Sequence, residues 1–127
     1  MEFPKEWQDF ELIDSGNGEK LERWGEYILR RPDPQAIWNR DNSVKQWDDA
    51  DMVYYRSNSG GGHWDFITNV PDEWQIQYKN LTFNIRPTQF KHTGLFPEQA
   101  INWEKLTELI NKRKSNKNQS EIKVLNL

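Results

Sequence analysis

The feature of this sequence that most constrains its fold is a series of short runs in which apolar and polar residues alternate. Alternation with a period of two places one row of side chains against a core and the other toward solvent, as in half-buried β-strands. Glycine, asparagine and proline separate the runs and predict turns between them. Strand-like runs occupy residues 10–14, 21–24, 27–31, 52–56, 63–67, 74–78 and 81–85.

The turn residues predict how these runs pair. The SGNG segment at residues 15–18 predicts a hairpin over residues 10–25, and SGGG at 59–62 predicts a second one between the runs at 52–56 and 63–67. Lys79 and Asn80 connect a third hairpin. The polar stretch at 39–51 is expected to be a loop with one helical turn. We therefore expect an antiparallel, hairpin-built sheet over residues 10–86.

The character of the sequence changes at Pro97, which is a favoured residue in a first helical turn. Apolar residues then recur at helical spacing, at Trp103, Leu106, Leu109 and Ile110, so one long C-terminal helix is predicted. The fold class is α+β. Residues 1–96 form a β-rich domain, 97–114 a connecting helix, and the polar residues 115–121 a flexible linker.

The last six residues, IKVLNL at 122–127, are apolar on both faces, which is typical of a strand covered on each side. Two interpretations remain open: an edge strand of the β domain, or the first strand of a further domain. An unpaired strand edge also recruits other strands, so a homodimer through this segment is a further expectation.

Composition excludes several classes of protein. The 127 residues contain no cysteine and only two histidines, His63 and His92, so neither a disulfide framework nor a zinc site is expected, and no metal is assigned. No apolar stretch is long enough to span a membrane, and the N-terminus is too polar for a signal peptide, so a cytoplasmic location is predicted. The net charge of -3 gives no overall attraction to nucleic acid.

Two local features admit a binding interpretation beside a structural one. A basic group (Arg30, Arg31, Arg40, Lys45) with Trp38 and Trp47 is suited to hold unpaired bases, but five aspartates lie in the same region and favour a solvated loop. The SGGGH segment at 59–63 offers successive backbone N–H groups to an anion, whereas an ordinary hairpin turn explains it equally.

Five strings in the sequence resemble the leading part of class I S-adenosylmethionine-dependent methyltransferases that act on large-subunit ribosomal RNA. They are FELIDSG (10–16), GEKLERWG (18–25), RRPDPQAIW (30–38), GGGHW (60–64) and FKHTGLFPEQ (90–99). The resemblance covers nearly the whole chain. His92 is inserted between Lys91 and Thr93 of the related pattern, and Ala100 and Trp103 replace arginines of that group.

The resemblance implies an enzyme whose Rossmann-like cofactor domain opens with the strand at 122–127 and whose catalytic residues lie outside this chain. It places the cofactor- or substrate-binding residues at Lys91, Thr93, Gly94, Phe96, Gln99, Asn102 and Asn126. Residues 1–96 would then face the substrate, with ribosomal RNA as partner and S-adenosylmethionine as cofactor of the full-length enzyme. This chain alone would be inactive. The alternative is a free-standing RNA- or glycan-binding β module.

Overall fold

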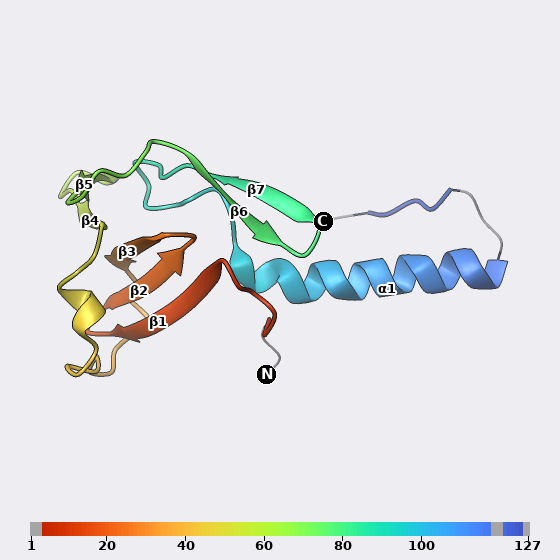
Figure 1. Cartoon of the computed structure of the whole chain (residues 1–127), viewed down its shortest axis with the longest axis horizontal. Coiled ribbons are helices and arrows are strands. Elements are labelled where there is room, and N and C mark those ends of the chain that lie inside the picture. The colour runs from red at the N-terminus through yellow and green to blue at the C-terminus, as the bar shows by residue number, and fades with distance from the viewer. Residues whose placement is uncertain (1–3, 118–120, 126–127) are drawn as a thin grey trace. The chain divides into compact units, whose positions relative to one another are not determined.

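The computed structural model describes residues 4–117 and 121–125 of the chain (Figure 1). It divides into two compact units, one formed by residues 6–95 and the other by residues 1–5 and 96–127. The first unit is built from strands, and the second from a helix and the segment that follows it.

A five-stranded sheet forms the larger part of the β unit. Its strands lie in chain order and are β1 (Phe10–Gly16), β2 (Glu19–Trp24), β3 (Tyr27–Pro32), β4 (Met52–Arg56) and β5 (Gly62–Phe66). A separate hairpin consists of β6 (Trp74–Tyr78) and β7 (Leu81–Ile85). The α+β class and the three predicted hairpins are confirmed.

The pairing of β3 with β4 differs from the predicted antiparallel sheet. These two strands are parallel, with Leu29 opposite Met52, and the strands as a whole form two sheets instead of one. The connection between β3 and β4 is long enough to carry the chain back across the sheet, as a parallel pair requires. It contains the predicted helical turn, the 3-10 helix η1 (Lys45–Trp47).

Both faces of the five-stranded sheet are covered. On one face, Leu21 and Val53 form a core cluster with Trp47 and Ala50 of the β3–β4 connection. The opposite face carries Glu22, Trp24, Leu29, Arg31, Met52 and Tyr54, all of them buried. Alternation along β2 and β3 therefore separates two buried faces, and some polar side chains lie inside the protein.

The β6–β7 hairpin is tied to the five-stranded sheet by tryptophans and by one aspartate. The Trp74 indole N–H donates to the Trp24 carbonyl at 3.0 Å, and the Trp7 ring packs on Tyr78 at a centroid distance of 4.6 Å. The backbone N–H of Gln77 donates to the Asp9 carboxylate at 2.8 Å. These links connect the hairpin to β2 and to the segment that directly precedes β1.

The second unit contains the 3-10 turn η2 (Pro97–Gln99) followed by α1 (Ala100–Lys117). Helical structure begins at the predicted proline with η2, and α1 extends into the predicted 115–121 linker, because Ser115, Asn116 and Lys117 include no helix-breaking glycine or proline. Within the described residues, no helix is both long and apolar enough to cross a membrane.

The segment after the helix does not form the predicted strand where it is described. Residues 121–125 have no regular secondary structure, and residues 118–120 and 126–127 lie outside the described part of the chain. The assignment of residues 122–127 to a further domain stays a prediction.

Candidate functional site

The loop that follows β7, residues 86–95, contains the first three of the predicted site residues, Lys91, Thr93 and Gly94. Its two arms are joined by backbone hydrogen bonds, from the N–H of Arg86 to the carbonyl of Thr93 (3.0 Å) and from the N–H of Thr88 to the carbonyl of His92 (2.7 Å). At its tip Lys91 has a φ of 66°, in the left-handed region. The loop is therefore an ordered structure with Lys91 at its turn.

Side chains from three strands hold the tip of this loop. Arg31 Nη1 of β3 donates to the Lys91 carbonyl at 3.0 Å, and the Trp64 indole of β5 donates to the Thr88 carbonyl at 2.8 Å. The Tyr54 hydroxyl of β4 donates to the Gln89 carbonyl. Fixed donors on the sheet thus determine where Lys91 lies.

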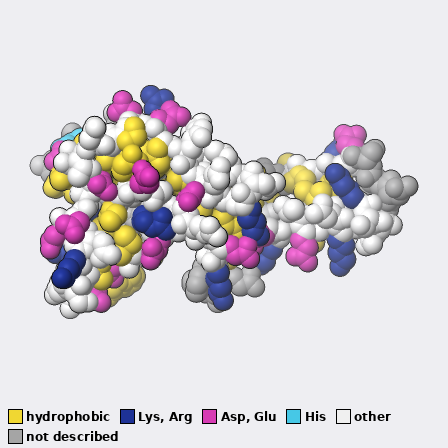
Figure 2. Space-filling view, in the orientation of Figure 1, with side chains coloured by type: hydrophobic (Ala, Val, Ile, Leu, Met, Phe, Trp, Pro, Cys, Tyr) yellow, Lys and Arg dark blue, Asp and Glu magenta, His cyan; other side chains and the backbone are white. Residues whose placement is uncertain are grey.

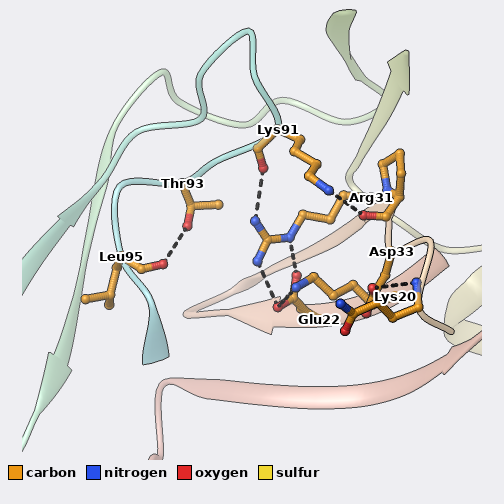
Figure 3. A network of polar contacts seen from close by, with 9 residues as sticks. Lys20, Glu22, Arg31, Asp33, Lys91, Thr93 and Leu95 are labelled. Atoms are coloured by element: carbon orange, nitrogen blue, oxygen red, sulfur yellow. Dashed lines mark hydrogen bonds and ion pairs between the residues drawn. The ribbon is translucent and has the colours of Figure 1, made fainter. Parts of the chain in front are cut away.

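Arg31 can serve as such a donor because it belongs to a buried ion pair (Figure 3). Its Nε and Nη2 donate to the two carboxylate oxygens of Glu22 at 2.6 and 3.1 Å, a bidentate arrangement. The guanidinium also lies over the Trp24 ring, 5.5 Å from its centroid. Glu22 is 3% exposed and Arg31 7%, so the protein holds a rigid, neutralised pair directly beneath the loop.

The Lys91 side chain lies in a cationic environment. Its Nζ donates to the Pro32 carbonyl at 3.3 Å (Figure 3). Burial, together with the nearby cations Arg56, Lys20 and Arg31, lowers the pKa of Lys91, and Asp33 acts in the opposite direction. In its charged form the amine, together with the cations around it, favours the approach of an anion.

Lys91 also lines an open pocket of about 220 Å³. The other lining residues come from β4, from the β4–β5 turn and from the loop: Tyr54, Arg56, Ser57, Gly60, Gly61 and Phe90. The sequence predicted the turn and Lys91, but it did not single out Arg56 or Phe90. A cation that directly precedes a glycine-rich turn was the available signal for Arg56.

The remaining site predictions have different outcomes. Thr93 is buried, and its hydroxyl donates to the Leu95 carbonyl at 3.4 Å, so this residue stabilises the loop. Gly94 has a φ of 92°, which glycine adopts without strain, and it lies at a bend of the chain. Lys91, Thr93 and Gly94 are thus brought together within one loop.

Phe96, Gln99 and Asn102 belong to the helical unit. The Asn102 amide donates to the Gln99 side-chain oxygen at 2.8 Å, and both residues are exposed. Asn126 lies outside the described residues. Whether these residues contact a cofactor or substrate stays a prediction.

The basic group considered for base stacking is largely used within the protein. Arg31 and Trp47 are buried, and Arg30 makes a bidentate contact with Glu19, both bonds 2.7 Å long. The Arg40 guanidinium lies 4.9 Å from the centroid of the Trp47 ring. On the face shown in Figure 2, cationic and anionic side chains are interspersed. The described residues contain no cluster of three or more potential metal ligands.

No protein-family model matches the sequence, and no curated protein is significantly similar to it. Among solved structures, the chain is similar to an S-adenosylmethionine (SAM)-dependent methyltransferase from Agrobacterium tumefaciens, at 38% identity and a TM-score of 0.75. The chain shares its fold with part of that protein. The match covers 82% of this chain and 33% of the other, so the chain spans about a third of its relative.

Proposed function

We propose that this chain is one part of a SAM-dependent methyltransferase and that it lies on the substrate side of the enzyme. The observation that carries the proposal is the similarity at 38% identity to a methyltransferase of known structure, over 82% of this chain. Since the match covers only 33% of that protein, the cofactor domain is assigned to sequence outside the 127 residues.

The residues of this chain support the assignment of cofactor binding to another part of the protein. Thr93 uses its hydroxyl within its own loop, and Gln99 and Asn102 hydrogen-bond to each other. These side chains do not by themselves form a binding site for SAM. The methyl donor would come from the cofactor domain, while this chain would hold and orient the acceptor, because methyl transfer depends largely on positioning.

The acceptor that we propose is RNA, and specifically ribosomal RNA. Support comes from the resemblance of the five sequence strings to ribosomal RNA methyltransferases and from the cations Arg56 and Lys91 beside one pocket. In a chain with a net charge of -3, such a local concentration of cations is suited to a polyanionic substrate.

The experiment compares residues 1–127 with the protein encoded by the full reading frame. SAM binding is measured by calorimetry, and transfer of a labelled methyl group is measured with ribosomal RNA, protein and small-molecule acceptors. We expect SAM binding and RNA labelling only with the full-length protein. Micromolar SAM binding by residues 1–127 would contradict the proposed division, and labelling of protein alone would contradict the RNA acceptor.

The same experiment tests the alternative of a free-standing RNA- or glycan-binding module. A reading frame that stops after Leu127, together with RNA or glycan binding by the 127-residue chain, would favour the module. A frame that continues into a glycine-rich turn and a SAM-binding protein would favour the enzyme.

A further inference from the structure

Two cations line the pocket beside the β4–β5 turn, and the attraction of the Asp33 carboxylate for Lys91 is outweighed by burial and by the neighbouring cations. Arg56 ends β4, and Lys91 lies at the tip of the 86–95 loop, which fixed donors hold against the sheet. Among the described residues neither cation forms an ion pair, whereas Arg31 beneath them is neutralised by Glu22. The unbalanced charge at this point of the surface is therefore positive.

The glycine turn that lines the same pocket also carries backbone hydrogen-bond donors. Gly60 and Gly61 both have left-handed φ values, 91° and 68°. Ser57 maintains this geometry, because its N–H donates to the Gly61 carbonyl at 3.1 Å and its hydroxyl to the Gly60 carbonyl at 2.9 Å. Within the described part of the chain, the N–H groups of Gly60 and Gly61 have no acceptor. Successive free N–H groups in a turn form an anion-binding concavity.

An exposed aromatic ring lies beside these donors. Phe90 lines the pocket and is 58% exposed, although it is a large apolar residue. It is adjacent to the glycine turn, since a Cβ atom built on Gly61 would lie 3.8 Å from Phe90 Cε1. An exposed flat ring next to cations is the arrangement with which proteins stack an unpaired base while they hold its phosphate.

We propose that this pocket binds a phosphate of single-stranded RNA through Arg56, Lys91 and the Gly60–Gly61 amides, with the adjoining base stacked on Phe90. The pocket of about 220 Å³ has room for a phosphate group, and the exposed Phe90 ring is available to the adjoining base. A base inside a duplex is already stacked, so single strands are preferred. The choice of RNA rests on the proposed function, whereas the anion-binding geometry does not.

The test is a titration of the isotope-labelled 127-residue chain, followed by NMR. The ligands are a short single-stranded RNA, the same RNA annealed to its complement, and inorganic phosphate. We expect the amide signals of Gly60 and Gly61 to shift with the single strand, and weaker binding of the duplex and of phosphate. Equal affinity for duplex and single strand would overturn the stacking, and equal affinity for phosphate alone would overturn the RNA assignment.

Variants separate the two contributions. Arg56→Gln and Lys91→Gln should each weaken RNA binding and reduce the slope of log affinity against log salt by about 0.7, the value for one phosphate contact on a single strand. Phe90→Ala should weaken RNA binding roughly five- to a hundredfold and leave phosphate binding unchanged. Lys45→Gln is the matched control, because it removes one charge from η1, over the opposite face of the sheet.

The variants also distinguish failure of this inference from failure of the proposed function. The Arg56→Gln/Lys91→Gln double variant should retain the folded spectrum and lose RNA binding. If it binds RNA like the wild type, or if Lys45→Gln has the larger effect, the pocket assignment is refuted, even where the full-length enzyme methylates RNA. If the double variant loses binding but the full-length protein methylates no RNA, the pocket stands and the proposed activity fails.

Discussion

Replacement of Glu22 by glutamine tests whether the buried ion pair supports the fold and the loop above it. The substitution keeps the side chain's size but removes the negative charge opposite Arg31, which is only 7% exposed. Breaking one partner of a buried pair costs about 3–5 kcal/mol. The glutamine oxygen, the Lys91 carbonyl and the Trp24 ring still contact the guanidinium, so we expect a loss near the lower end, about 3 kcal/mol.

Urea denaturation followed by tryptophan fluorescence measures this loss. With a slope of about 1–3 kcal/mol per molar urea, the unfolding midpoint should fall by roughly 1–3 M. Glu19→Gln is the matched control, because it removes the carboxylate from an equally bidentate pair with Arg30. In this pair the Glu19 side chain is 25% exposed and the Arg30 side chain 29%. The control should cost less than about 1 kcal/mol, since solvent screens a partly exposed pair. If Glu22→Gln costs no more than Glu19→Gln, the burial argument is refuted.

Two further predictions concern packing and pH. Gly62→Ala should destabilise the domain by at least about 2 kcal/mol in the same denaturation assay, because the new Cβ atom would overlap the Tyr55 carbonyl oxygen. An unchanged midpoint would contradict this contact. Burial raises the pKa of Asp14, but hydrogen bonds from the Trp47 indole and from backbone N–H groups outweigh this effect. The pKa of Asp14 therefore lies below its ordinary value of 3.8. Its contribution to stability is therefore complete above that value and is lost as the pH falls through the lowered pKa, so Asp14→Asn should flatten the acid limb of stability measured between about pH 5 and pH 2.

The sequence predicts those parts of the fold that local chemistry determines. Each hairpin has its turn residues between its two strands, so the pairing needs no information from elsewhere in the chain. The parallel pairing of β3 with β4 was not predicted, because the connection between them is long and its path depends on burying Trp47 against Leu21 and Val53. That contact is a property of the assembled core.

In the candidate site, too, the sequence predicts what local chemistry determines and does not predict contacts that arise only in the folded protein. The family resemblance predicts Lys91 as a site residue. The same resemblance predicts Gly94, and so does the turn chemistry of glycine. Arg56 was not found, because it meets Lys91 only after β4 has paired with β3 and the 86–95 loop has folded back onto the sheet. Glu22 and Arg31 look like surface charges in an alternating strand, and only the cover on both faces of the sheet makes them a buried pair.

The position of Lys91 is also informative about what the loop is for. A lysine whose pKa is lowered by burial and by neighbouring cations destabilises the folded state while it is charged. That penalty is complete below the lowered pKa and is lost as the pH rises from the lowered pKa to the ordinary value of 10.5. The protein nevertheless holds the loop that carries Lys91 in place with donors from three strands. One of these donors, Arg31, belongs to an ion pair that is itself costly to bury. Folding alone does not account for a charge fixed where it is unfavourable, whereas an anion bound between Arg56 and Lys91 would convert the repulsion into attraction.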